Sequence, residues 1–134
     1  ADLVLGKDDD VIKTILGATD GRGVDNSCEF SGSPAALSNA IHSTRMGGYV
    51  YILSVYGHTM TEIPMNEVVF RYLHLKGING RKMWSTWDKM HVLLEQGSID
   101  VDRILTHRMP VSDFKQGIAL ALSGECGKVV LDFD

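Results

Sequence analysis

The sequence predicts an α/β fold built on a doubly wound parallel sheet. Three observations lead to this prediction. Strand-like apolar runs alternate with segments of helical periodicity along most of the chain. The run "YVYILSV" at residues 49–55 is β-branched and aromatic with little polarity, as in a buried parallel strand. Glycine-containing turns separate the strand-like runs from the helical segments.

The first unit of this alternation is a strand followed by a helix. Residues 2–5 ("DLVL") predict a short strand. The carboxylates at residues 8–10 supply the N-cap and first turn of a helix. That helix is expected to bury its apolar positions Val11, Ile12, Ile15 and Leu16. The next strand is expected at residues 24–30.

The second unit has clear helix signals. Ser33 is a good N-cap and Pro34 suits the first helical position, which predicts a helix over residues 35–45. The pair Gly47-Gly48 is expected to end this helix. The strand at residues 49–55 then follows.

Two more units follow with weaker signals. Asn66 is expected to cap a short helix that ends at Val69, and residues 73–78 predict a strand. A helix is expected from Lys82 to the stop at Gly97, with one apolar face made by Met83, Trp87, Met90 and Leu94.

The last third of the chain predicts a strand–helix–strand segment. We expect a strand at residues 104–109, a helix at residues 112–123 and a final strand in "KVVLDF". These shorter units need not belong to the same sheet as the preceding strands.

Composition narrows the classes of function. The 134 residues carry a net charge of −4 and scattered basic side chains, which argues against nucleic acid as a partner. No apolar stretch approaches the roughly 20 residues of a membrane span. The two cysteines lack the C-x-x-C spacing of a zinc knuckle and do not indicate a disulfide framework. We expect a cytoplasmic setting.

The sequence contains none of the common catalytic or histidine metal-binding motifs. The five histidines show no H-x-x-x-H or H-E-x-x-H spacing, so a histidine metal site is not indicated. No G-x-S-x-G elbow is present. Glu29 lies near the end of a predicted parallel strand, where active sites of open α/β sheets gather. Two interpretations of Glu29 stay open: an active-site carboxylate, or a cap for the turn at Ser31-Gly32.

The turns after three predicted strands are the best indication of a binding site. They are Ser31-Gly32, the segment 53–55 and the segment 78–80. In a doubly wound sheet these carboxyl ends line a single crevice, where small residues let a flat ligand approach the main chain. A G-x-G-x-x-G after the first strand, with an acidic residue about 20 positions later, would mark a pyrophosphate site, and this sequence has neither.

Five segments together resemble the C-terminal part of medium-chain zinc-dependent alcohol dehydrogenases. They are "GRGVD", "GGYVYILSV", "LHLKGINGR", "ILTHRMPVSDFKQGI" and "SGECGKVVLDFD". The likeness covers nearly the whole chain in order, and it is greatest to the L-threonine 3-dehydrogenase branch, with sorbitol dehydrogenase-like enzymes next.

The resemblance implies a partial Rossmann-like coenzyme domain. Its strand order would be 3-2-1-4-5-6, and this chain would hold strands 3 to 6. Residues 1–102 would be the partial NAD(P)-binding domain, and residues 103–134 would return to the catalytic domain. The zinc ligands, the glycine fingerprint and the ribose carboxylate would lie upstream, so no catalytic or metal residue is carried over.

The resemblance also implies contacts with NAD. Leu53, Ser54 and Val55 match a segment whose backbone faces the nicotinamide, with Ser54 in place of the usual glycine. Ile78 and Asn79 match a second nicotinamide-side contact. One further residue, Lys128, falls near a position where some relatives place an arginine on the pyrophosphate.

Missing strands would leave unpaired sheet edges. We expect residues 2–5 to fill the vacant slot beside the strand at 24–30, to fray, or to pair with another copy. In the family the strand at residues 73–78 pairs with its twofold mate, which implies a homodimer or higher homo-oligomer through that edge.

Three hypotheses follow about function. The first is the coenzyme-binding portion of an NAD-dependent zinc dehydrogenase that oxidises a secondary alcohol, such as a polyol or threonine. This chain alone is then expected to be inactive and to bind NAD weakly or not at all. The second is a non-catalytic dimerisation module derived from a dehydrogenase. The third is a Rossmann-like binder of another nucleotide such as S-adenosylmethionine, which lacks an acidic ribose-binding signal.

Overall fold

A computed structural model describes residues 2–6, 8–57 and 60–133. The chain divides into two compact units, unit 1 (Ala1–Gly80) and unit 2 (Arg81–Asp134). Each unit combines parallel strands with helices, so the predicted α/β class is confirmed. The predicted division at residues 102 and 103 concerns the domains of a longer protein and stays a prediction.

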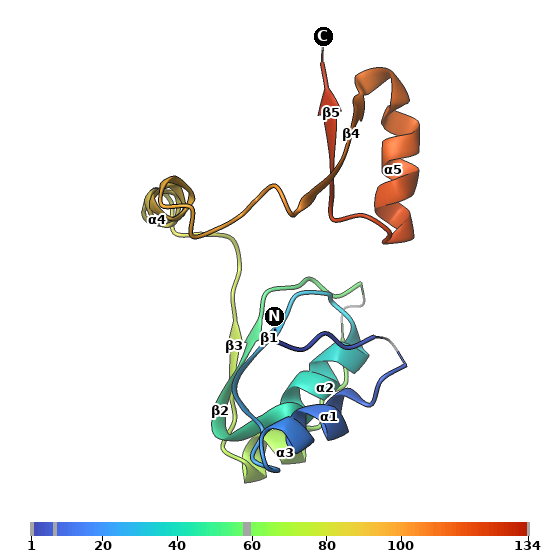
Figure 1. Ribbon diagram of the computed structural model, residues 1–134. Coiled ribbons are helices and arrows are strands. Elements are labelled where there is room, and N and C mark those ends of the chain that lie inside the picture. The colour runs from blue at the N-terminus through green and yellow to red at the C-terminus, as the bar shows by residue number, and fades with distance from the viewer. Residues whose placement is uncertain (1, 7, 58–59, 134) are drawn as a thin grey trace. The chain divides into compact units, whose positions relative to one another are not determined.

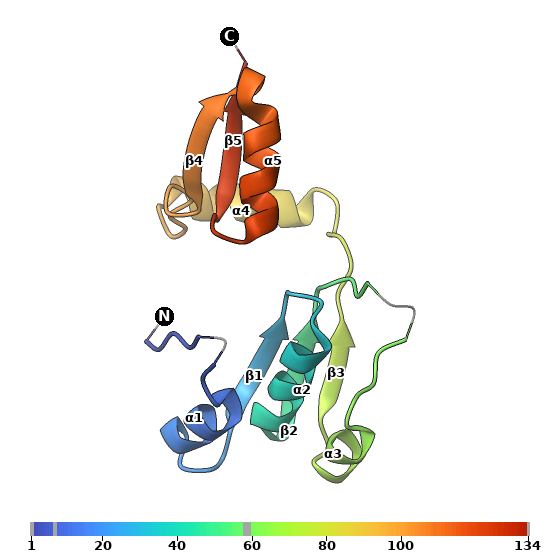
Figure 2. The ribbon, with the colours of Figure 1, turned by 90° about the vertical axis from the view of Figure 1, so that its right-hand side faces the viewer.

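Unit 1 holds a three-stranded parallel sheet. Its strands are β1 (Val24–Glu29), β2 (Thr44–Ile52) and β3 (His74–Gly77), in the order β1-β2-β3. The helices α1 (Val11–Ala18), α2 (Pro34–Ser43) and α3 (Met65–Phe70) all lie on one face of this sheet (Figures 1 and 2). One-sided helices follow from right-handed crossovers that all advance in the same direction across the sheet.

Local capping explains the first two helices. Asp10 accepts a hydrogen bond from the Lys13 amide at 3.0 Å and caps α1. The Ser33 side chain accepts from the Ala36 amide at 3.4 Å, and Pro34 occupies the first turn of α2. Both caps are confirmed, because each side chain satisfies an amide that the first helical turn leaves unpaired.

The core of unit 1 lies between α2 and the sheet. Leu37 and Ile41 of α2 pack with Val50 of β2 and with Leu73, which precedes β3, and all four side chains are buried. Ile41 and Val50 are completely inaccessible to solvent. Six partly buried side chains extend this cluster: Ala40, Ile52, Tyr56, Ile63, Val68 and Leu75. The core is small, so each of its members contributes a large share of the apolar burial.

The first predicted strand is not formed. Residues 2–6 have no strand or helix, and the Val4 side chain is 83% exposed. The segment therefore does not fill the slot beside β1, whereas its pairing with another copy stays a prediction. A four-residue strand without two flanking neighbours gains too few hydrogen bonds and contacts to offset its loss of backbone entropy.

The glycine pair at positions 47 and 48 lies inside a strand, and its predicted role as a helix stop is wrong. The helix ends earlier, at Ser43, and β2 begins at Thr44. Gly47 has a φ of +69°, and the pairing of β1 with β2 is irregular here, as in a β-bulge. A Cβ on Gly48 would lie 2.9 Å from the Asp25 carbonyl oxygen, so this position also needs glycine for close strand approach.

The third helix also begins differently from the prediction. Residue Asn66 lies inside α3, which starts at Met65, and no side chain caps it. Asn66 is therefore not its N-cap. A different helix end is capped by a side chain after α3: the Arg71 guanidinium donates to carbonyl oxygens at the C-terminal end of α2. These oxygens belong to Ile41, His42 and Thr44.

Unit 2 contains α4 (Ser85–Glu95) and a separate two-stranded parallel sheet. Its strands are β4 (Leu105–Pro110) and β5 (Lys128–Asp132), connected by a short 3₁₀ turn, η1 (Val111–Asp113), and by α5 (Phe114–Ser123). Figure 2 shows α5 lying along this sheet. The predicted strand–helix–strand segment is therefore confirmed, and its strands form a sheet of their own.

Close packing of α5 requires a small residue. Gly117 is buried in α5, and a Cβ there would lie 3.2 Å from Met109 Sδ and 3.3 Å from Val129 Cγ1. The other helix of this unit, α4, has no buried residue, and its apolar side chains at Trp87 and Met90 are half exposed.

Candidate functional site

The predicted crevice positions of unit 1 lie together at the carboxyl ends of its strands. The Leu53 amide donates to the Glu29 carbonyl oxygen at 3.0 Å, which continues the pairing of β1 with β2. The Ile78 amide donates to the Ile52 carbonyl oxygen at 2.9 Å, which continues the pairing of β2 with β3. The segments after β2 and β3 are thus neighbours, as a parallel sheet requires.

Glu29 is the polar centre of this edge. Its side chain is only 3% exposed. One oxygen, Oε1, accepts from the Ser31 amide at 2.7 Å, the Ser31 hydroxyl at 2.6 Å and the Gly32 amide at 3.0 Å. The other oxygen, Oε2, accepts from the Ser54 hydroxyl and from the Tyr56 hydroxyl at 2.7 Å.

These contacts decide between the two interpretations of Glu29. The carboxylate caps the turn at Ser31-Gly32, as one of them predicted, and it also holds the loop after β2. Five donors occupy its two oxygens, so it has little capacity to take up a proton from a substrate. Sequence reasoning missed Tyr56; the signal was a second hydroxyl side chain two positions beyond Ser54, on the same side of an extended segment.

The environment strongly favours the charged form of this carboxylate. Burial by itself raises the pKa of Glu29, but hydrogen bonds from Ser31, Ser54 and Tyr56 outweigh it and lower the pKa to about 2. Burial and the neighbouring Glu29 raise the pKa of Tyr56, so its hydroxyl stays a donor at neutral pH.

A pH dependence of stability follows from this pKa. The folded value of about 2 lies below the ordinary value of 4.5, so Glu29 stabilises unit 1 above pH 4.5 and loses that effect as the pH falls from 4.5 to 2. The loss should approach about 3 kcal/mol. Urea unfolding at several pH values checks this, and Glu29→Gln is expected to remove most of the acid dependence. A matched variant of an exposed carboxylate, Glu62→Gln, should retain it.

The loop after β2 has two different sides. Ser54 and Tyr56 turn inward to Glu29, whereas Leu53 and Val55 are 41% and 91% exposed. Beside them, after β3, Ile78 is 38% exposed. Three predicted contact residues therefore present apolar side chains to solvent at the same end of the sheet. Ser54 is a fourth predicted contact residue, and its hydroxyl is hydrogen-bonded to Glu29. A ligand contact at Ser54 would therefore be made by its backbone.

The glycines at this edge have different structural causes. A Cβ on Gly32 would lie 2.6 Å from the Val55 carbonyl oxygen, and Gly32 has a φ of +73°. The turn after β1 therefore needs glycine to pack against the loop after β2. No atom of the described chain lies within 4 Å of a Cβ built on Gly77 or Gly80, so neither is required for close packing within this chain. Gly80 instead has a φ of +63°.

Two other predicted contact residues are not members of this apolar group. Asn79 follows Ile78 and is exposed. Lys128 begins β5 in unit 2 and is also exposed. The roles of both residues toward a coenzyme stay predictions.

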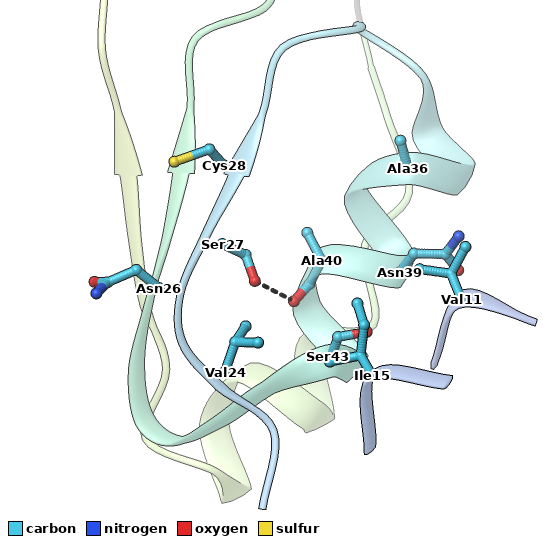
Figure 3. A pocket seen from close by; sticks show the side chains of 10 residues that line it. All are labelled: Val11, Ile15, Val24, Asn26, Ser27, Cys28, Ala36, Asn39, Ala40 and Ser43. Atoms are coloured by element: carbon cyan, nitrogen blue, oxygen red, sulfur yellow. Dashed lines mark hydrogen bonds between the residues drawn. The ribbon is translucent and has the colours of Figure 1, made fainter. Parts of the chain in front are cut away.

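Among the described residues β1 pairs with β2 alone, and a groove of unit 1 runs along the other edge of β1. It has a volume of about 420 Å³ and lies between β1, α1 and α2 (Figure 3). Ser43 Oγ lies buried at this groove and has no hydrogen-bond partner in the described chain. The lining residues are Val11, Ile15, Val24, Asn26, Ser27, Cys28, Ala36, Asn39, Ala40 and Ser43.

The described part of the chain has neither a metal-ligand cluster nor a membrane-spanning helix. Within residues 2–6, 8–57 and 60–133, no three His, Cys, Asp or Glu side chains gather as a metal site would need. None of the helices described here is long and apolar enough to cross a bilayer.

Comparison with known proteins places the chain in a family. The profile of the zinc-binding dehydrogenase family matches residues 1–96. The chain belongs to the zinc-binding dehydrogenase family. It is 38% identical over 130 residues to L-threonine 3-dehydrogenase of Bacillus licheniformis, and 40% identical over 123 residues to that of Bacillus subtilis. These alignments cover 97% and 92% of this chain.

Solved structures of dehydrogenases share the fold. The chain superposes on 2R,3R-butanediol dehydrogenase from Bacillus subtilis with a TM-score of 0.82 and 28% identity, covering 96% of this chain and 36% of that enzyme. An alcohol dehydrogenase from Thermus sp. ATN1 gives a TM-score of 0.84 at 23% identity, over 98% of this chain and 38% of that enzyme. The arrangement is therefore that of the Rossmann-like coenzyme domain of alcohol dehydrogenases.

The match covers only part of each relative. The chain spans 38% of the length of the Bacillus licheniformis enzyme and 35% of the Bacillus subtilis one. Activity, substrate and partners of a whole zinc-binding dehydrogenase are therefore matters of proposal for this chain.

Proposed function

We propose that this chain is the coenzyme-binding portion of an NAD-dependent zinc dehydrogenase of the alcohol, polyol or threonine type. The observation that carries the proposal is the apolar group of Leu53, Val55 and Ile78, exposed at the carboxyl ends of adjacent parallel strands. Ligands of open α/β sheets bind outside these strand ends. The family assignment supports the same conclusion.

The residues at this edge fit the nicotinamide half of NAD. The three exposed apolar side chains offer a surface for a flat aromatic ring. Bound there, the coenzyme would supply the hydride acceptor for oxidation of a secondary alcohol. The residues of the chain would orient the ring and exclude water from one of its faces.

The residues do not fit a zinc ion. The described part of the chain gathers no set of three metal-ligating side chains, and so we assign no step to zinc within it. In the proposed parent enzyme the ligands would come from the upstream catalytic domain. Residues 103–134 would return to that domain.

The free edge of β1 supports the proposal of a longer protein. In the strand order implied by the family resemblance, the neighbour of β1 is the first strand of the coenzyme domain, which carries the phosphate-binding glycines. The groove beside β1, with the unpartnered Ser43 Oγ, is where that strand and its helix would pack.

The 134-residue chain alone is expected to be inactive. It would offer the nicotinamide side of the site without the pyrophosphate side, so NAD should bind weakly or not at all. Calorimetric titration with NAD to millimolar concentration checks the binding, and NADH absorbance with threonine, butanediol or sorbitol checks the activity. Clear saturable binding of NAD would contradict the expected weakness.

The reading frame upstream of Ala1 tests the proposal at the level of sequence. A frame that encodes G-x-G-x-x-G and Cys and His zinc ligands is the expected result. A start codon at this point would favour the alternative, a non-catalytic dimerisation module.

The outer edge of β3 is the observation that favours this alternative. Among the described residues of unit 1, β3 pairs with β2 alone, so its other edge could pair with a second copy through residues 73–78. Light scattering is expected to show a homodimer or higher homo-oligomer. A monodisperse monomer would contradict association through this edge.

A further inference from the structure

We propose that Glu29 is a positioning residue that fixes which side of the loop 53–56 faces the coenzyme. This inference rests on the proposed function. A single buried carboxylate accepts hydrogen bonds from the turn after β1, through Ser31 and Gly32, and from the loop after β2, through Ser54 and Tyr56. Two segments far apart in sequence thus share one acceptor group.

The connection sets the orientation of the exposed residues. In an extended segment successive side chains point to opposite sides. Because Ser54 and Tyr56 are drawn to the carboxylate, Leu53 and Val55 must point away from it, toward solvent. The two inward contacts therefore select one of two possible faces of the loop. Without them, the hydrogen bond from the Leu53 amide to β1 and the close packing of Val55 against Gly32 would remain to hold the register of the loop.

The turn after β1 supports the loop from behind. The backbone of Gly32 lies so near the Val55 carbonyl group that a Cβ would be 2.6 Å from its oxygen. Glu29 Oε1 holds this turn through two amides at 2.7 and 3.0 Å. Turn and loop therefore form one packed unit around the carboxylate.

This role acts through geometry alone. The carboxylate is 3% exposed and its oxygens are occupied by protein donors, so it does not touch a ligand at the strand ends. Its effect on a coenzyme would come through the placement of Leu53 and Val55.

The test removes the two loop donors and leaves the turn intact. In the 134-residue chain, Ser54→Ala combined with Tyr56→Phe keeps Glu29 and its bonds to Ser31 and Gly32. Amide hydrogen exchange of Leu53 is expected to accelerate about tenfold or more, since two charge-assisted hydrogen bonds are lost. The amide resonances of residues 53–55 should shift, while those of the core residue Val50 stay in place.

Control variants separate this effect from general destabilisation. Tyr51→Phe removes a hydroxyl from β2 outside the Glu29 contacts and should leave the exchange of the Leu53 amide unchanged. The single variants Ser54→Ala and Tyr56→Phe, each retaining one inward contact, should give smaller increases than the double variant. Unchanged exchange and resonances at residues 53–55 in the double variant, with a folded core, would overturn the inference.

A kinetic readout separates positioning from a merely structural role. In the protein extended upstream of Ala1, the double variant is expected to raise the KM for NAD about tenfold with little change in the KM for the alcohol. Equal effects on both constants would contradict positioning toward the coenzyme. An inactive wild-type extended protein would contradict the proposed function instead, and the exchange experiment would still decide the role of Glu29 in the loop.

Discussion

Replacing Ile41 by alanine is expected to lower the free energy of unfolding of unit 1 by about 3 kcal/mol. Ile41 is completely buried and is one of four buried apolar residues in the core of the described chain. The truncation loses the transfer free energy of the buried methyl and methylene groups. It also leaves a cavity that the surrounding side chains fill only in part. Urea unfolding checks this, followed through amide resonances of unit 1 because the two units need not unfold together.

The matched control for this variant is Val69→Ala. Val69 belongs to the same unit, on α3, but its side chain is 59% exposed. Its loss should change the free energy of unfolding by less than about 0.5 kcal/mol. If the two variants unfolded at the same urea concentration, the buried core assigned to α2 and β2 would be wrong.

Replacing Gly32 by alanine is the second change with a large expected effect. Its φ of +73° disfavours any side chain, and the new Cβ would meet the Val55 carbonyl oxygen at 2.6 Å. We expect a loss of about 2–4 kcal/mol from backbone strain and steric overlap together. The turn and the loop around Glu29 should separate, so the amide resonances of residues 53–56 should shift as well.

A control variant at Gly21 separates the backbone strain from the steric overlap. It has a φ of +77°, but no described atom lies within 4 Å of a Cβ built there. Gly21→Ala therefore tests backbone strain alone and should cost about 1 kcal/mol. A Gly32 variant no less stable than the Gly21 variant would show that the close approach to Val55 is absent in solution.

Local signals in the sequence were sufficient for most of the fold. The caps at Asp10 and Ser33 are short-range chemistry, and the apolar run of β2 carries its own strand preference. Positions that depend on tertiary context were not predictable in the same way. The glycine pair in β2 looks like a helix stop in sequence, yet it forms a bulge because Asp25 of β1 requires a close approach.

In the candidate site, too, some features follow from local sequence and others depend on tertiary packing. The parallel topology was enough to place Leu53 and Ile78 at one sheet edge. The convergence of Ser54 and Tyr56 on Glu29 joins residues 25 and 27 positions apart. No local pattern specifies such a contact, because it depends on how the ends of two strands pack. Likewise, "DLVL" has strand propensity but lacks the neighbours that a strand needs.

One measurement tests the central claim most directly: alcohol-dependent reduction of NAD by the protein expressed from a reading frame extended upstream of Ala1. The account predicts zinc-dependent NADH formation with a secondary alcohol such as threonine, butanediol or sorbitol, and none with the 134-residue chain alone. An extended protein that binds zinc and is folded, yet reduces no NAD with any of these alcohols, would contradict the proposal that this chain is the coenzyme-binding portion of a dehydrogenase.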